Sequence, residues 1–251
     1  MARAAADLVA EAEAEADANL ELRASWNVAP TADVPIVLER LVAGRPVRQV
    51  HVARWGLVPG WAKDPSVGVR AFNARSETVL EKPTFREAAA ARRCAVPVDG
   101  YYEWKAEPGK GRRPYFVSRT DGSPIFLAGL YEWWKDPAKA AGDPGRWLLS
   151  TSVLTVASPP ADSAHPVLRE LGELHDRLPV ALSRPAMAAW LAPPEGPGGA
   201  AEMVAMATGQ AYASAAEWTL GEAHRDVGNV RNDGGYLLHP EAQGKRADML
   251  F

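Results

Sequence analysis

The sequence predicts an α+β fold, and three observations carry that prediction. The middle of the chain holds short runs of β-branched and aromatic residues, interrupted at close intervals by Pro and Gly. Segments rich in Ala, Leu, Glu and Met flank this region at both ends. No internal repeat and no long linker divides the chain. We therefore expect a single domain over residues 1–240, followed by a flexible tail over residues 241–251.

The elements follow from local patterns along the chain. Residues 3–19 favour a helix whose thin apolar face, around Leu8 and Val9, needs a partner for stability. "PVRQVHVARWGLVPGW" is typical of short strands broken by Pro and Gly. "RPYFVSRTDGSPIFLAGLYEWW" predicts two strands around an Asp121-Gly122 turn, and "RWLLSTSVLTVA" predicts another strand. The middle of the chain is therefore mainly β.

Two helices are expected towards the C-terminal end. "SRPAMAAWL" offers Ser183 as an N-cap, an early Pro and then good helix formers. "APPEGPGG" reads as a loop because of its helix-breaking residues, and "AAEMVAMA" as a second, short helix.

Charge and cysteine content limit the classes of function. A formal net charge of -3 argues against a protein that coats nucleic acid by bulk charge, but it allows a local basic groove. A single cysteine cannot form an internal disulfide, and the C-x-x-C and H-E-x-x-H patterns of metal sites are absent. We expect no metal and no cofactor. Without a signal-peptide pattern or an apolar run long enough to span a bilayer, we expect a cytoplasmic protein that makes no membrane contact.

Polar residues in "VRAFNARSETV" are the first candidates for chemistry. Asn73, Arg75 and Glu77 alternate with Phe72, Ala74 and Ser76, so on a strand the first three share one face. An amide, a guanidinium and a carboxylate on one face could line a polar cleft. A solvated sheet face with an Arg-Glu pair explains the same pattern equally well.

Two further segments place a titratable group beside apolar residues. Glu103 lies among the aromatic residues of "VDGYYEWK", where burial would raise its pKa and suit it to proton transfer. His175 precedes an apolar run and has Arg177 close by. For each, a solvated polar side chain is the alternative. Cys94, at the head of an apolar strand, is expected to be a buried thiol.

Aromatic and cationic residues are interleaved in two stretches. Trp26, Trp55 and Trp61 lie near Arg54 and Arg70 in the first quarter of the chain. "KAEPGKGRRP" gathers Lys105, Lys110, Arg112 and Arg113. This composition is typical of single-stranded nucleic-acid grooves, although most tryptophans are core residues.

Seven segments together resemble the SRAP (SOS response-associated peptidase) family in their order and approximate spacing: "SWNVAPT", "RWGLVPGW", "FNARSET", "CAVPVDGYYEWK", "PIFLAGLYEWW", "LHDRLPVAL" and "DVGNVRNDG". The resemblance runs from about Trp26 to Gly235. It implies an α+β fold with a bifurcated mixed β-sheet and a barrel-like core surrounded by helices. It also implies a nucleoid-associated protein that binds single-stranded DNA and links covalently to abasic sites.

The resemblance assigns roles to individual residues. It implies that Asn73, Glu103 and His175 are catalytic. Asn73 would orient the terminal residue, Glu103 would move protons during methionine removal and condensation, and His175 would assist opening of the sugar ring. The resemblance further implies that five residues contact DNA. Arg75 and Arg177 would hold phosphates, whereas Asn27, Pro30 and Trp61 would shape the DNA path.

The start of the chain departs from the family pattern. The family's nucleophile is a cysteine in a Met-Cys-Gly-Arg start, whose amine and thiol close a thiazolidine on the abasic aldehyde. This sequence begins Met1-Ala2-Arg3. Either translation starts several codons upstream, or the protein is a variant without the crosslinking thiol. The retained Asn73, Glu103 and His175 favour the first explanation.

The alternative functions are a non-covalent single-stranded DNA binding module, a weak imine-forming lyase and a Cys94/His175 hydrolase. The C-terminal segment "GKRADMLF" ends in Met249, Leu250 and Phe251, and it resembles the short peptides that bind bacterial sliding clamps. A disordered end is the alternative for that segment.

Overall fold

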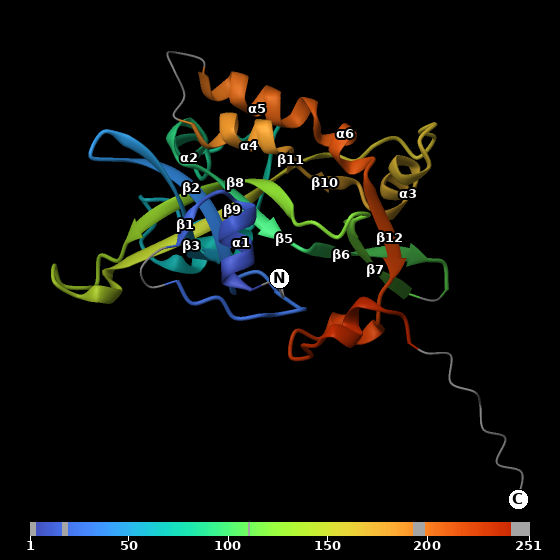
Figure 1. Cartoon of the computed structure of the whole chain (residues 1–251). Coiled ribbons are helices and arrows are strands. Elements are labelled where there is room, and N and C mark those ends of the chain that lie inside the picture. The colour runs from blue at the N-terminus through green and yellow to red at the C-terminus, as the bar shows by residue number, and fades with distance from the viewer. Residues whose placement is uncertain (1–3, 17–19, 110, 193–198, 242–251) are drawn as a thin grey trace, which may run out of the picture.

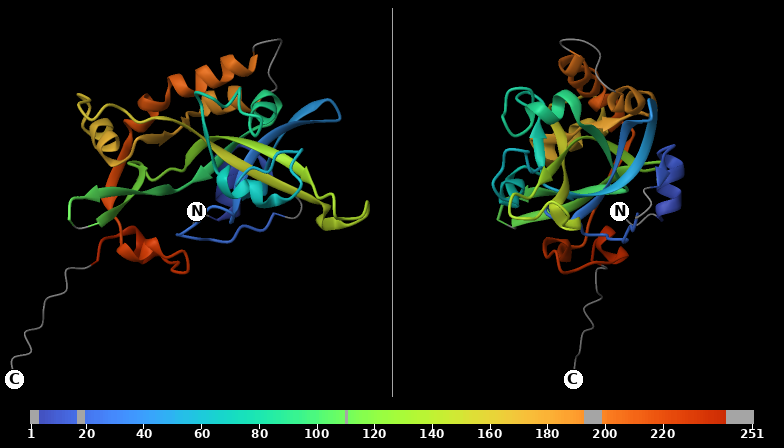
Figure 2. Two further views of the ribbon diagram at one scale, coloured as in Figure 1. Left: turned by 180° about the vertical axis from the view of Figure 1, so that it is seen from behind. Right: turned by 90° about the vertical axis from the view of Figure 1, so that its left-hand side faces the viewer.

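A five-stranded ring forms the centre of the protein. The computed structural model describes residues 4–16, 20–109, 111–192 and 199–241. The ring follows the order β3-β2-β5-β8-β9, and it closes because β3 also pairs with β9, at Arg54 with Ser150 and at Trp55 with Thr151. The right-hand view of Figure 2 looks along this ring. Its strands are β2 Asp33–Val42, β3 Arg45–Trp55, β5 Arg93–Val98, β8 Ile125–Lys135 and β9 Trp147–Ala157.

Short strands extend the ring at its edges, and a second sheet stands beside it. The short strands are β1 Glu15–Ala16 on β3, β4 Asn73–Arg75 and β10 Arg177–Pro179 on β9, and β11 Ala181–Leu182 on β8. The second sheet has the order β12-β7-β6 and comprises β6 Gly100–Glu107, β7 Gly111–Arg119 and β12 Trp218–Glu222. Figure 1 places it beyond the end of β5.

Helices cover one side of the ring. Figure 1 shows α4, α5 and α6 along the top, with α3 near the second sheet. The α-helices are α1 Ala5–Glu11, α2 Arg86–Ala91, α3 Pro166–Leu174, α4 Arg184–Leu191, α5 Gly199–Gly209 and α6 Ala211–Ala215. In the described part of the chain, 3-10 helices span Pro65–Arg70, Pro144–Arg146, Arg225–Gly228 and Gly235–Leu238. Within the described residues, no helix is long and apolar enough to cross a membrane.

The hydrophobic core has two layers because successive strand residues point to opposite faces. Leu38 and Cys94 belong to the cluster inside the ring, whereas their neighbours Val37 and Ala95 belong to the cluster under the helices. The fully buried Trp190 of α4 anchors the outer layer. The predicted α+β class with a mixed sheet and a barrel-like core is confirmed.

Several predicted elements are observed where local signals were strong. The strand in "RWLLSTSVLTVA" is β9, and α4 starts at the predicted cap, where the Ser183 hydroxyl accepts from the backbone N–H of Ala186. The second C-terminal helix is α5. The two strands around Asp121-Gly122 are β7 and β8, with Gly122 at φ +71° in the turn, but they do not pair with each other. One belongs to each sheet.

The predicted N-terminal helix over residues 3–19 is too long. It ends at Glu11, Glu13 adopts a positive φ of 50°, and Glu15–Ala16 pairs with the edge of β3. Leu8 is fully buried, but no apolar side chain larger than alanine follows Val9 within the predicted helix, so pairing with the sheet edge prevails over helix propensity. Residues 1–3 lie outside the described residues. So does the predicted tail after Glu241, including the proposed clamp-binding residues Met249, Leu250 and Phe251.

Candidate active site

Glu103 and His175 meet where the second sheet faces the end of α3. Glu103 lies on β6, and His175 is the residue that directly follows α3. The Oε1 atom of Glu103 is 3.9 Å from Nε2 of His175, with side chains 25% and 42% exposed. This separation is longer than a hydrogen bond, and both side chains remain partly exposed to solvent.

A second pair of residues supports this meeting. Lys105 lies two residues after Glu103 on β6, on the same face of the strand, and Glu173 lies two residues before His175. The Nζ atom of Lys105 is 2.9 Å from Oε2 of Glu173. An exposed ion pair of this kind contributes at most about 1 kcal/mol to stability. Its geometric effect is to align the end of α3 with β6.

The environment of Glu103 favours its protonated form. Burial against the second sheet raises the pKa of Glu103, while a positive charge on His175 and the backbone N–H of Trp104, 3.2 Å from Oε1, oppose that rise. Burial is the largest of these effects, so the expected rise in the pKa of this carboxyl is confirmed. A carboxyl group tuned upward is suited both to accept and to return a proton near neutral pH.

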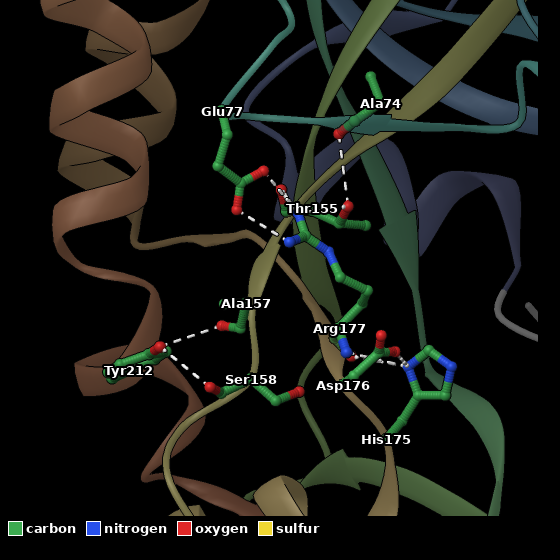
Figure 3. Close-up of polar contacts among 9 residues, drawn as sticks. All are labelled: Ala74, Glu77, Thr155, Ala157, Ser158, His175, Asp176, Arg177 and Tyr212. Carbon is green, nitrogen blue, oxygen red and sulfur yellow. Dashed lines mark hydrogen bonds and ion pairs between the residues drawn. The ribbon is translucent and has the colours of Figure 1, made fainter.

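Three groups lie within reach of Nδ1 of His175: the backbone N–H of Arg177 at 3.0 Å, the Arg177 carbonyl at 3.3 Å and the Asp176 carboxylate at 3.2 Å. In the tautomer whose Nδ1 accepts from the Arg177 N–H, the ring carries its proton on Nε2, the nitrogen that faces Glu103. When the ring takes a second proton, Nδ1 can donate to the Asp176 carboxylate, 3.2 Å away. Figure 3 shows this arrangement around His175. That tautomer, like the doubly protonated ring, places an N–H donor opposite a carboxyl group.

The predicted face of Asn73 and Arg75 exists. Both side chains are exposed on β4, whereas Ala74 between them is fully buried. Neither side chain has a hydrogen-bond or ionic partner within the described residues. β4 lies parallel to β9, with Arg75 opposite Thr155, so both side chains are available to a ligand.

The Arg-Glu pair that we expected as an alternative forms between different residues. Glu77 lies beyond the end of β4 and binds Arg177 of β10, not Arg75. The two Nη atoms of Arg177 reach the two carboxylate oxygens at 2.8 and 2.9 Å, and Nη2 also donates to the Thr155 carbonyl at 2.7 Å (Figure 3). The predicted phosphate contact of Arg177 is untested, and in this structure a carboxylate occupies its guanidinium.

The other predicted DNA-binding residues lie apart from this pair. The side-chain nitrogen of Asn27 donates to three carbonyls of the loop after Arg225, those of Val227, Asn229 and Asn232, at 3.0 to 3.2 Å. Pro30 is exposed. Trp61 is 57% exposed, and its indole N–H donates to the Pro83 carbonyl at 3.3 Å. Their contacts with DNA remain predictions.

Cys94 is buried, as predicted. Its thiol lies inside the ring, fully buried, with Sγ 3.4 Å from the Thr151 hydroxyl. Burial raises the pKa of Cys94 to about 12, so the thiolate is not available at neutral pH. These observations exclude the Cys94/His175 hydrolase. Among the residues that the structure describes, no group of three or more His, Cys, Asp or Glu side chains could hold a metal ion.

Two ion pairs beside the candidate site residues were not predicted from the sequence. The Lys105–Glu173 and Arg177–Glu77 pairs join segments that are far apart in the chain. The sequence contained a weak signal for the first pair, because Lys105 lies two residues after Glu103 and Glu173 lies two residues before His175. The second had none, since Arg75 is the neighbour that spacing on a strand would pair with Glu77.

Comparison with known proteins gives consistent matches. The family model described as SOS response associated peptidase (SRAP) matches residues 1–230. "Abasic site processing protein YoqW" of Bacillus subtilis is 35% identical over 174 residues, which is 69% of each chain. "Abasic site processing protein YedK" of Escherichia coli is 30% identical over 217 residues, 86% of this chain and 84% of that protein.

Solved structures agree in fold. A crystal structure of a Bacteroides thetaiotaomicron protein superposes with a TM-score of 0.73 and covers 96% of this chain and 98% of that chain. Its sequence identity is 22%, so this likeness concerns the fold alone.

Proposed function

The chain belongs to the SRAP family, and on that premise we propose that it binds single-stranded DNA and processes the abasic sites in it. The relatives named above are abasic site processing proteins. The observation that carries the proposal is the approach of Glu103 Oε1 and His175 Nε2 to 3.9 Å. This arrangement suits proton transfer to and from a sugar aldehyde.

The proposed covalent step starts from the open form of an abasic site, which is an aldehyde. The amine of an N-terminal cysteine adds to the carbonyl carbon, and the resulting hydroxyl leaves as water to give an imine. The cysteine sulfur then adds to the imine carbon and its proton passes to nitrogen, which closes a thiazolidine ring. One water is lost overall. We assign the cysteine to a Met-Cys-Gly-Arg start, as in the family that the sequence resembles.

The site residues would then share the proton transfers. Glu103 accepts a proton from the attacking amine and returns it to the departing hydroxyl, a cycle that its raised pKa favours. In its doubly protonated form His175 gives the Nε2 proton to the ring oxygen of the closed sugar, and the C1′ hydroxyl gives its proton to water, so that the C1′–O4′ bond breaks and the aldehyde forms. Asn73, whose exposed amide has no partner among the described residues, would orient the terminal residue, and Arg75 would hold a backbone phosphate.

The experiment compares two starts of the same chain. The sequence as printed and a form preceded by Met-Cys-Gly-Arg are each incubated with an abasic single-stranded oligonucleotide and then heated in denaturant. We expect a heat-stable adduct from the extended form only. The printed form would give at most a reversible imine through the amine of Ala2. A heat-stable adduct from the printed form would overturn the proposal.

A non-covalent single-stranded DNA binding module is the second candidate. The exposed side chains of Arg75 and Trp61 favour it, because they offer a phosphate contact and a stacking surface without any nucleophile. It predicts equal DNA affinity for the two starts and no adduct from either.

A further inference from the structure

The carboxylate of Glu77 lies where a DNA phosphate would otherwise bind Arg177. We propose that Glu77 occupies the phosphate-binding edge of Arg177 in the free protein and is displaced by a backbone phosphate, so that Glu77 sets the affinity for single-stranded DNA. This inference rests on the DNA binding proposed above and extends it to a residue with no assigned role.

The contact between Arg177 and Glu77 has the shape of an arginine–phosphate contact. Arg177 meets Glu77 end-on, with Nη1 to Oε1 at 2.8 Å and Nη2 to Oε2 at 2.9 Å. This two-pronged geometry is the one by which arginine recognises phosphate, so the carboxylate and a phosphate compete for the same donors. Both cannot occupy that edge at once.

Of the two partners, Glu77 is the one that can move. Arg177 is held in place, because its side chain is only 19% exposed and Nη2 also donates to the Thr155 carbonyl at 2.7 Å. Glu77 is 50% exposed and lies in the turn that follows β4. In the close-up of Figure 3 it approaches the guanidinium from the opposite side to His175. Glu77 can therefore swing into solvent while Arg177 stays in position.

Arg75 provides a second positive charge on the same face as Arg177. Arg75 and Arg177 lie on strands that flank β9, and their register positions opposite Thr155 and Ala157 place both on one face of the sheet. Arg75 has no partner within the described part of the chain. The carboxylate of Glu77 cancels one of these two positive charges. A phosphate that displaces Glu77 meets both.

The guanidinium of Arg177 also has an unsatisfied hydrogen-bond donor. Nε of Arg177 is buried and has no hydrogen-bond partner among the described residues. The Glu77 carboxylate therefore does not satisfy all the donors of the guanidinium. A phosphodiester carries two non-bridging and two ester oxygens, so with a bridging water beside this edge it can engage more of these donors than the carboxylate does.

The test measures binding of an unmodified single-stranded oligonucleotide by fluorescence anisotropy over a range of salt concentrations. The proteins are the wild type, Glu77→Gln, Arg177→Gln and the double variant. For Glu77→Gln we expect roughly three- to tenfold tighter binding at low salt and a salt dependence steeper by about 0.7, the value for one more neutralised phosphate on a single strand. In the Arg177→Gln background, Glu77→Gln should have no effect.

Matched controls separate this local effect from net charge and from misfolding. Glu11→Gln breaks the exposed Arg184–Glu11 pair, 2.7 Å between Nη2 and Oε2, and makes the same change in net charge on α1. It should leave affinity unchanged. Glu77→Asp, whose shorter carboxylate reaches the guanidinium less well, should give an intermediate affinity, and its melting curve reports folding.

Unchanged or weaker binding by Glu77→Gln, an equal gain in Glu11→Gln, or a gain that persists without Arg177 would each overturn the inference. If the folded wild type binds no single-stranded DNA and every variant behaves alike, the proposed DNA binding itself fails. If instead the wild type binds DNA and Glu77→Gln does not change the affinity, only the inference about Glu77 fails.

Discussion

Replacing Glu103 with Gln tests the proposed site in two ways at once. The substitution keeps the shape and the hydrogen-bonding capacity of the side chain but removes its ability to carry a proton. Because Glu103 and His175 face each other at 3.9 Å without a hydrogen bond between them, the change breaks no direct bond in the free protein. The structure should therefore survive it, and effects on rate can be assigned to proton transfer.

The expected loss of rate follows from the proposed role of Glu103 in proton transfer. A positioned acid or base contributes about 10²–10⁴-fold in rate, equivalent to about 3–5 kcal/mol of activation free energy. We expect Glu103→Gln to slow adduct formation by that factor in the form that carries the N-terminal cysteine. Because both residues serve one reaction, adding His175→Gln should cost much less than its effect alone.

The effect on stability has the opposite sign. Burial raises the pKa of Glu103 above its ordinary 4.5, so the folded state binds this proton more tightly than the unfolded chain does. The free energy of unfolding therefore falls as pH rises from 4.5 through the raised pKa, and the ionised carboxylate costs stability at neutral pH. Glu103→Gln should be more stable than the wild type at pH 7, and this gain should disappear below pH 4.5.

The assay pairs single-turnover adduct formation with urea unfolding at neutral and acidic pH. Slow adduct formation with raised stability at neutral pH is the expected combination. Fast adduct formation by Glu103→Gln would refute the proton-transfer role. A variant that is less stable than the wild type at pH 7 would refute the explanation by burial.

Three further substitutions test the framework around the site. Arg93 is buried and donates to the carbonyls at the ends of α2 and α4, including that of Trp190 at 2.8 Å, so Arg93→Met should lower the free energy of unfolding by about 2–4 kcal/mol in urea; a loss below about 1 kcal/mol would contradict this. Cys94→Ala should leave adduct formation by the extended form unchanged on a denaturing gel, because the thiol is buried inside the ring, and loss of the adduct in a folded variant would overturn that view. Asn27→Ala removes the three bonds to the loop after Arg225 and should cost about 1–3 kcal/mol, with faster hydrogen exchange in that loop; unchanged exchange there would argue against its anchoring role.

Local signals in the sequence predicted the elements that depend on neighbours in the chain. The cap at Ser183, the apolar run of β9 and the turn at Asp121-Gly122 are determined within a few residues, and all three are observed. The assignment of β7 and β8 to different sheets depends on partners far along the chain. Local propensity contains no information about those partners.

In the candidate site, too, the sequence predicted the features that depend on neighbours in the chain and not those that depend on distant partners. The desolvation of Glu103 could be predicted from its aromatic neighbours, and alternation along the strand predicted that Asn73 and Arg75 share an exposed face. The meeting of Glu103 with His175 was implied by the family resemblance and not by spacing. The partner of Glu77 followed from neither, since β9 separates β4 from β10 and brings Arg177 to a carboxylate that an isolated strand would pair with Arg75.

The central claim is that an N-terminal cysteine reacts with an abasic aldehyde beside Glu103 and His175. The most direct measurement is the intact mass of the adduct between abasic single-stranded DNA and the form that begins Met-Cys-Gly-Arg, followed by peptide mapping. The expected mass is the sum of the methionine-free protein and the DNA less one water, with the sugar on the N-terminal cysteine and no need for a reducing agent. A link mapped to Cys94 or to a lysine would contradict it, as would an adduct seen only after chemical reduction.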